Sequence, residues 1–258
     1  DLTDDNGDLA APTSTNNNGS ITLTGTLNYG GLIGTTTGAN ITNFQGGSTN
    51  DNLLTFTGGT GVNVGGVVGN SARSVTISAV SGGANVRDSY NIQADTINAG
   101  GLVGNSTGGV NISGKIVNYG SLVINATGTT STNNSDTASA NNVGGFVGSV
   151  TGNVNITGTA RNNLSQYTGH IFINSASTAN VGGIVGNITS GVIGNGASEN
   201  NRNQGIVYTS FGGTIRIAKA STIRAGGTIG HLGITESPSI QGNYNYGDIY
   251  ISNIAGVT

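Results

Sequence analysis

The stretch NVGGVVGNSARSVTIS, residues 63–78, places a glycine-rich motif just before a run in which every second residue is apolar. The chain contains six versions of the motif: YGGLIG, VGGVVG, AGGLVG, VGGFVG, VGGIVG and AGGTIG. Their first glycines are separated by 35, 35, 44, 38 and 44 residues and are Gly30, Gly65, Gly100, Gly144, Gly182 and Gly226. A period of roughly 20 to 50 residues indicates a solenoid, a propeller or an array of repeats.

Two further elements recur within each period, and both alternate apolar and polar residues. One follows the glycine motif, as in VTIS from residue 75 and VNIS from residue 110. The other precedes it, as in LLTFTG from residue 53 and TIRIAK from residue 214. This alternation predicts β-strands, so we expect three short strands per unit, joined by turns rich in Gly and Asn.

Three short strands per unit form one coil of a parallel β-helix, in which each strand pairs with its equivalent about 4.8 Å away. A six-bladed propeller is the alternative. A closed ring needs equal numbers of each strand, whereas this chain has seven copies of the alternating strand and six glycine motifs. The sequence therefore predicts an all-β fold, a parallel β-helix (β-solenoid) of about six to seven three-stranded coils. We expect one domain over residues 21–258, with insertions near 128–142 and 194–205, after a polar, acidic tail over residues 1–20.

The composition excludes several functional classes. The 258 residues include 47 Gly and no Cys, so disulfides and cysteine metal sites are excluded. Charged residues make up 7% and the net charge is −3, which gives nucleic-acid binding little electrostatic basis. No apolar run approaches the roughly 20 residues that a membrane-spanning helix needs. The absence of Met predicts a processed or excised chain.

The glycine motif also predicts which side chains face the core. Counting from its first glycine as zero, position +3 is always Ile or Val, as expected of a buried column. Position +1 is then an inward glycine that leaves room for a bulky side chain from an opposite wall. Strand alternation places position +2 outside, as an assembly ridge that either the chain's own insertions or another molecule would cover. The ridge residues are Leu32, Val67, Leu102, Phe146 and Ile184.

At these residues the sequence resembles the GLUG repeat family, named for Gly-Leu-hydrophobic-Gly. The matching tetrapeptides are GLIG, GVVG, GLVG, GFVG, GIVG and GTIG, and the resemblance covers nearly all of the chain from about residue 20. It departs from the family pattern at Thr228, where an apolar residue is expected. The resemblance implies a segment of a large bacterial surface protein or adhesin, hence a secreted, extracellular or cell-surface location. It implies no catalytic residue, because the motif contains none.

Few residues suggest chemistry. Outside the tail, only Asp88 and Asp95 place two acids in one coil, and lone aspartates more often cap turns. His170 and His231 belong to different coils. The acidic tail is a partial match to a calcium loop but lacks the final acid; its acids are Asp1, Asp4, Asp5 and Asp8. We therefore expect no catalytic, cofactor or metal site. One repeat phase instead predicts an amide ladder, at Asn40, Asn111 and Asn155.

Three functional hypotheses follow. The first is a non-enzymatic extracellular structural protein, either a stalk or adhesin segment that continues in a longer surface protein, or a subunit of a head-to-tail filament. In the filament, strand 248–254 would pair with a neighbour's first coil through Ile249, Tyr250 and Ile251. The second is a module that binds a glycan or host surface through its insertions, with sugar-stacking residues among Tyr90, Tyr167, Tyr208 and Tyr244. The third is a polysaccharide-degrading enzyme.

Overall fold

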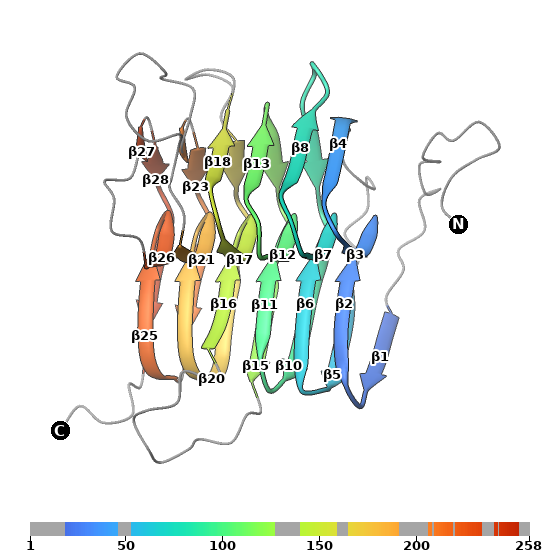
Figure 1. The fold of residues 1–258 in the computed structure, drawn as a ribbon. Coiled ribbons are helices and arrows are strands. Elements are labelled where there is room, and N and C mark those ends of the chain that lie inside the picture. The colour runs from blue at the N-terminus through green and yellow to red at the C-terminus, as the bar shows by residue number, and fades with distance from the viewer. Residues whose placement is uncertain are drawn as a thin grey trace.

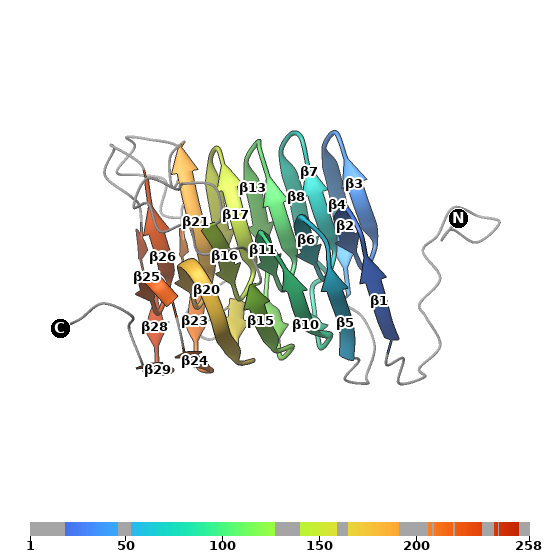
Figure 2. The same ribbon diagram turned by 90° about the horizontal axis from the view of Figure 1, so that it is seen from below.

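The computed structural model is built from strands and turns, with no helix in its described part (Figure 1). It describes residues 19–45, 53–126, 140–158, 165–190, 206–207, 209–218, 220–233, 240–241 and 243–252. Successive coils stack side by side, so that the first and last strands lie at opposite ends (Figures 1 and 2). The expected all-β parallel β-helix is therefore confirmed.

The strands form five stacks, which we call walls 1 to 5 in chain order. Wall 1 contains β1 (Gly19–Leu23), β5 (Leu53–Gly58), β10 (Ser89–Ala94), β15 (Leu122–Ala126), the first part of β20 (Ile171–Gly182), β24 (Thr214–Ile217) and β29 (Asp248–Ile251). Wall 2 contains β2 (Thr26–Gly30), β6 (Gly61–Gly65), β11 (Ile97–Gly100), β16 (Ala140–Gly144), the second part of β20 and β25 (Ala220–Gly226). Because β20 belongs to both, these two walls join into one sheet.

The remaining walls follow the glycine motif. Wall 3 contains β3 (Ile33–Thr36), β7 (Val68–Ser71), β12 (Val103–Ser106), β17 (Val147–Thr151), β21 (Val185–Ser190) and β26 (Ile229–Leu232). Wall 4 contains β4 (Ala39–Phe44), β8 (Val75–Ala79), β13 (Val110–Ser113), β18 (Val154–Thr157), β22 (Ile206–Val207) and β27 (Ile240–Gln241). Wall 5 contains β9 (Ala84–Val86), β14 (Ile116–Asn118), β19 (Ser165–Tyr167), β23 (Thr209–Phe211) and β28 (Tyr244–Asn245).

A complete coil thus has five strands, and the expectation of three was wrong. Wall 5 was missed because its strands are only two or three residues long, within segments rich in Asn, Ser and Gly. The strands of walls 2 and 3 were read as one because they lie on either side of the glycine motif. The number of coils agrees with the prediction: six are stacked, and β29 begins a seventh.

Equivalent motif positions pair with each other even where the spacing along the chain differs. Val68 pairs with Val103 after 35 residues, and Val103 pairs with Val147 after 44, at the same motif position. The extra residues of the longer period fall mainly in 127–139, outside the described residues. The insertion expected at 128–142 ends earlier than predicted, because residues 140–142 belong to β16.

The core contains the predicted β-branched column. Position +3 is fully buried in four coils, at Val68, Val103, Val147 and Val185, and half-buried in the two end coils. Position +1 also faces inward as predicted. A methyl group added at Gly145 would collide with the Tyr167 ring, and one at Gly183 with the Phe211 ring. Those two rings are stacked with their centroids 5.9 Å apart, so the motif glycines provide the space for an aromatic column from wall 5.

Position +2 lies in the core, contrary to the prediction of an outward ridge. The motif is a two-residue corner: wall 2 ends at the first glycine and wall 3 begins at position +3. At this corner the N–H groups of Val67 and Val68 both donate to the Leu102 carbonyl, at 3.0 and 2.9 Å. Successive amides of a regular strand point to opposite neighbours, whereas these two point to the same coil. The alternation is therefore interrupted, and consecutive side chains both face inward.

A ladder of hydrogen-bonded asparagine side chains runs along position −2 of the motif. The Nδ2 atom of each later asparagine donates to the Oδ1 atom of the preceding one, at 2.7 to 2.8 Å. The ladder runs through Asn28, Asn63, Asn98, Asn142 and Asn180. In the last coil Arg224 replaces the asparagine and donates to Asn180 Oδ1 at 3.2 Å. The guanidinium of arginine has no acceptor, so this residue ends the ladder.

The amide ladder predicted in wall 4 is confirmed in part. Asn155 Nδ2 donates to Asn111 Oδ1 at 2.8 Å. Asn40 does not extend this ladder, because it pairs in register with Thr76.

No helix in the described part of the chain is long and apolar enough to cross a membrane.

Candidate functional site

The predicted assembly ridge is not a surface. Val67 and Ile184 are 1% exposed, and Leu102 and Phe146 are completely buried. Leu32, in the first coil, is half-buried. All five pack in or against the continuous hydrophobic core, so no partner can dock on them while the coils are stacked. Sequence alternation failed here because the corner places positions +2 and +3 on the same side of the backbone.

The predicted pairing strand is exposed, in contrast. β29 pairs with β24 on one side, joining Ile215 to Ile249 and Ile217 to Ile251. On its other side no described strand pairs with it. Ile249, Tyr250 and Ile251 are 36%, 57% and 45% exposed. The structure therefore leaves three apolar side chains in contact with solvent at the last strand it describes.

Other exposed apolar side chains of the described chain lie mostly at the two ends of the stack. Leu232, Ile240 and Tyr246 belong to the last coil, and Ile21 and Leu53 to the first strands of wall 1. Tyr119, in the middle, is exposed as well, and there the Arg87 guanidinium lies 4.6 Å from the centre of its ring.

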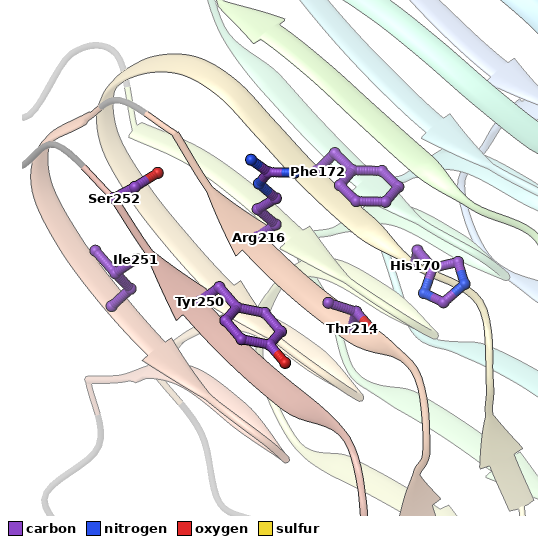
Figure 3. Close-up of a pocket in the computed structure, with 7 residues that line it drawn as sticks. All are labelled: His170, Phe172, Thr214, Arg216, Tyr250, Ile251 and Ser252. Atoms are coloured by element: carbon purple, nitrogen blue, oxygen red, sulfur yellow. The ribbon is translucent and has the colours of Figure 1, made fainter.

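An open groove of about 550 Å³ lies on the outer face of wall 1 at its C-terminal end (Figure 3). Three adjacent strands supply its residues: β20, β24 and β29. The lining residues are His170, which directly precedes β20, Phe172, Thr214, Arg216, Tyr250, Ile251 and Ser252, which directly follows β29. The groove is part of the described chain's surface, in contrast to the predicted ridge.

Strand register places an aromatic ring on each side of a cation in this groove. Phe172 pairs with Arg216, and Arg216 pairs with Tyr250. Phe172 and Arg216 point outward, because their strand neighbours Ile171, Ile173, Ile215 and Ile217 are fully buried, and the register with Arg216 places Tyr250 on the same face. Neighbouring strands are about 4.8 Å apart. The result is a row of Phe172, Arg216 and Tyr250 across three strands; in Figure 3 the guanidinium lies toward Phe172 and the Tyr250 ring points the other way along its strand.

The ends of the groove have different polarity. The His170 ring lies beside Phe172, with 5.8 Å between ring centres. On the last strand the Tyr250 hydroxyl donates to Asp248 Oδ2 at 3.3 Å. Thr214 pairs in register with Asp248 and adds a hydroxyl to the lining. Arg216, which is exposed, makes no hydrogen bond or ion pair with the described residues, so its guanidinium is open to a ligand.

The sequence contained a signal for this groove. Aligning HIFINS, TIRIAK and DIYISN by strand phase places Phe172, Arg216 and Tyr250 at the same outward position. Tyr250 was considered only for strand pairing. The combination was missed because the three residues belong to three strands that lie far apart in the sequence.

The structure separates the residues that had been considered for catalysis. Asp88 and Asp95 flank opposite ends of β10, which places their backbones about 20 Å apart at roughly 3.3 Å per residue. The described residues contain no cluster of three or more His, Cys, Asp or Glu side chains that could hold a metal ion. The tail acids Asp1, Asp4, Asp5 and Asp8 lie outside the described residues.

The two histidines have unrelated surroundings. His170 is exposed beside the groove, whereas His231 is half-buried in β26. The His231 Nδ1 atom lies 2.7 Å from Asn187 Oδ1, and its N–H donates to that oxygen. Burial lowers the pKa of His231, and the nearby positive charge of Arg224 lowers it further.

Two of the four tyrosines considered for sugar stacking are buried core residues. Tyr90 and Tyr167 are fully buried, and burial raises the pKa of both hydroxyls. The Tyr167 hydroxyl donates to the His170 carbonyl at 3.0 Å, whereas the Tyr90 hydroxyl has no hydrogen-bond partner in the described structure. Tyr244 stacks on Tyr246 at 5.9 Å, and Tyr208 lies outside the described residues.

No protein-family model matches the chain, and neither a curated protein nor a solved structure matches it. The resemblance to GLUG repeats therefore stays a prediction that rests on the six motifs.

Proposed function

We propose that this chain is a non-enzymatic structural protein of the cell exterior, a β-solenoid stalk or adhesin segment. One observation supports this most strongly: the same hydrogen-bonding and side-chain positions are stacked from coil to coil along the described chain. Each coil adds hydrogen bonds in every wall, an Ile or Val to the +3 column and, in five coils, an amide to the ladder. Such a stack holds its ends apart as a stalk does.

The surface is consistent with an exterior location. Charged residues are 7% of the chain, and Asn, Thr, Ser and Gly occupy the turns. With no cysteine, the fold is independent of the redox state of its compartment. The extracellular location itself comes from the GLUG resemblance.

Immunogold labelling of intact source cells tests the location, with permeabilised cells as the control. We expect label on the surface of intact cells. Label that appears only after permeabilisation would refute the extracellular stalk. Incubating the purified protein with polysaccharides and measuring reducing ends tests the non-enzymatic part, and we expect no release above the blank.

A head-to-tail filament is the second form of this proposal, and the exposed β29 favours it. Ile249 and Ile251 continue columns that are completely buried one strand earlier, at Ile215 and Ile217. A neighbour's β1, with its exposed Ile21, would cover them. An interface between unlike ends of the molecule propagates rather than closes.

Strand order limits where this contact can form. The last described strand of wall 1, β29, lies one coil beyond β25, the last described strand of wall 2. A neighbour whose β1 pairs with β29 would therefore place its β2 one coil away from β25, so that Arg224 and the neighbour's Asn28 would not meet. The filament contact is therefore proposed in wall 1, through β29.

Light scattering at increasing protein concentration tests the filament. We expect Ile249→Lys with Ile251→Lys to abolish association, because charges on an edge strand prevent pairing. Arg224→Asn, which changes wall 2 away from this contact, should leave association unchanged and serves as the control. Monomers at all concentrations for the unmodified chain would refute the filament and leave the stalk.

A further inference from the structure

We propose that the groove formed by β20, β24 and β29 binds an acidic polysaccharide, with Arg216 holding a uronate carboxylate and with Phe172 and Tyr250 stacking on the neighbouring sugar rings. This goes beyond the structural role proposed above. Only its biological meaning rests on the extracellular location; the binding itself does not. The second hypothesis placed glycan binding on the insertions and on other tyrosines, whereas this site lies on the sheet.

The arrangement of rings and charge indicates a chain of sugars. Phe172 and Tyr250 lie one strand to either side of Arg216, so their backbones are about two strand spacings, roughly 10 Å, apart. Aromatic faces offer flat apolar area, and sites for small ligands combine such area with a few polar groups. Thr214, Ser252 and His170 supply hydrogen-bonding groups in the same lining. A linear polymer that crosses the strands would contact ring, charge and ring in turn.

The charge of the groove selects an acidic ligand. A guanidinium binds a carboxylate with two parallel hydrogen bonds, which is stronger than a neutral hydrogen bond. Arg216 is exposed, and no described residue pairs with it. Among the described residues, the acid beside the row is Asp248, which accepts from the Tyr250 hydroxyl and does not line the groove. An exposed guanidinium with no partner among the described residues favours a carboxylate at Arg216.

The groove suits a sugar polymer better than an acidic peptide. It lies on a sheet face, where the backbone groups of β24 already pair with β20 and β29. A peptide laid across that face would find no backbone partner for its own N–H and C=O groups, and leaving such groups unpaired costs free energy. Sugar hydroxyls can remain in contact with water because the groove is open. The acidic segment DLTDDNGDL, residues 1–9, is the peptide of this chain with which the two ligands can be compared.

Isothermal titration calorimetry with polygalacturonate tests the proposal, with carboxyl-reduced polygalacturonate as the neutral control. We expect binding of the acidic polymer that weakens as NaCl rises, and at least tenfold weaker binding of the reduced polymer. Arg216→Gln should lose about tenfold in affinity, or about 1.4 kcal/mol, because it removes the charge-assisted hydrogen bonds to the carboxylate. Arg216→Lys should retain an intermediate affinity, because it keeps the charge and loses the paired geometry.

Matched variants separate the groove from the rest of the surface. Tyr250→Ala and Phe172→Ala should each weaken binding severalfold, whereas Tyr119→Ala and Arg73→Gln, which alter an exposed tyrosine and an exposed arginine elsewhere, should not. Thermal melting checks that each variant folds. Failure of the intact protein to bind polygalacturonate, equal loss in the control variants, or tighter binding of the peptide DLTDDNGDL would each overturn the site. None of these outcomes bears on the stalk, which immunogold labelling tests separately.

Discussion

The third and sixth coils contain the same glycine motif but differ in burial. In the third coil, residues 89–118, Val103, Ile112 and Ile116 are buried. In the sixth, residues 214–245, Ile229 is half-buried and Ile240 is exposed. Wall 1 is the exception in the sixth coil: Ile215 and Ile217 are completely buried because β29 covers them. The side chains of a column are therefore buried by the neighbouring coil rather than by the motif itself, as expected of nearest-neighbour stability in a solenoid.

Replacing the +3 residue should give the largest difference in stability between a middle coil and the last coil. Val103→Asp places a charge in a core with no partner for it, which costs on the order of 5 kcal/mol, so the middle coils should unfold or separate. Ile229→Asp should cost much less, because water reaches the last coil. Urea unfolding followed by circular dichroism measures both. Equal stability of Val103→Asp and the unmodified chain would contradict the inward assignment of position +3.

The first motif glycine should give the next largest effect. A Cβ atom at Gly100 would lie 2.7 Å from both Phe146 O and Gly148 N of the next coil, closer than atoms can approach. Gly100→Ala should therefore cost about 3 kcal/mol or more. Both glycines also face a carbonyl of their own corner, Val103 O or Ile229 O, but at Gly226 the three atoms nearest an added Cβ atom all belong to Ile229 and none to a next coil, so Gly226→Ala should cost less.

Gly82→Ala is the control for both glycine variants, because nothing lies within 4 Å of its added Cβ atom. Its melting temperature should stay within a few degrees of that of the unmodified chain, since exposed changes of this kind alter stability by about 0.5 kcal/mol. A Gly100→Ala melting temperature equal to that of Gly82→Ala would show that the corner can relax.

Substitutions in the amide ladder should show the same difference between middle and end coils, with a smaller loss of unfolding free energy. Asn98 donates to Asn63 and accepts from Asn142, at 2.8 and 2.7 Å, so Asn98→Ala removes one partner from each of these two amides and should cost about 2 kcal/mol. Arg224→Ala removes one bond at an exposed end and should cost well under half of that. Chemical denaturation distinguishes the two. Equal costs would mean that the ladder adds no more than isolated surface bonds do.

The smallest expected effect is a pH dependence confined to the last coil. His231 has a lowered pKa in the folded chain because of burial and Arg224. As pH falls through the ordinary histidine pKa of about 6.5, the unfolded chain takes up this proton first, so folded stability decreases. His231→Asn should remove that part of the pH dependence of the melting temperature. An unchanged pH profile in His231→Asn would assign the dependence to other groups.

The sequence predicted the repeat, the parallel stacking and the burial of position +3, because a period of six motifs and a β-branched column both follow directly from residue type. It did not predict the side-chain direction at Phe146, because alternation assumes a continuous strand and the motif is a corner. Asn118 precedes Gly120 in a segment where the sequence predicts a turn rich in Gly and Asn, yet it is buried and donates to the Gly145 carbonyl at 2.6 Å. Such a contact with a neighbouring coil has no local sequence signal.

The candidate site was less predictable still. The groove depends on which strands become neighbours, and the strands that hold Phe172, Arg216 and Tyr250 are 44 and 34 residues apart in sequence. The ladder at position −2 had a clear signal, since five of the six motifs have Asn there. That signal was missed because asparagine close to glycine is ordinarily typical of turns.

Because the strand register stays the same when the spacing changes, such a chain can vary in length at its turns over generations. Coils of 35 and 44 residues stack with the same partners at the same positions. A gain or loss of codons at a turn therefore alters what the molecule displays at that level and leaves every column above and below in place. The fold separates the part of the gene that must be kept from the part that is free to vary, so its surface can diversify without a new solution to the folding problem.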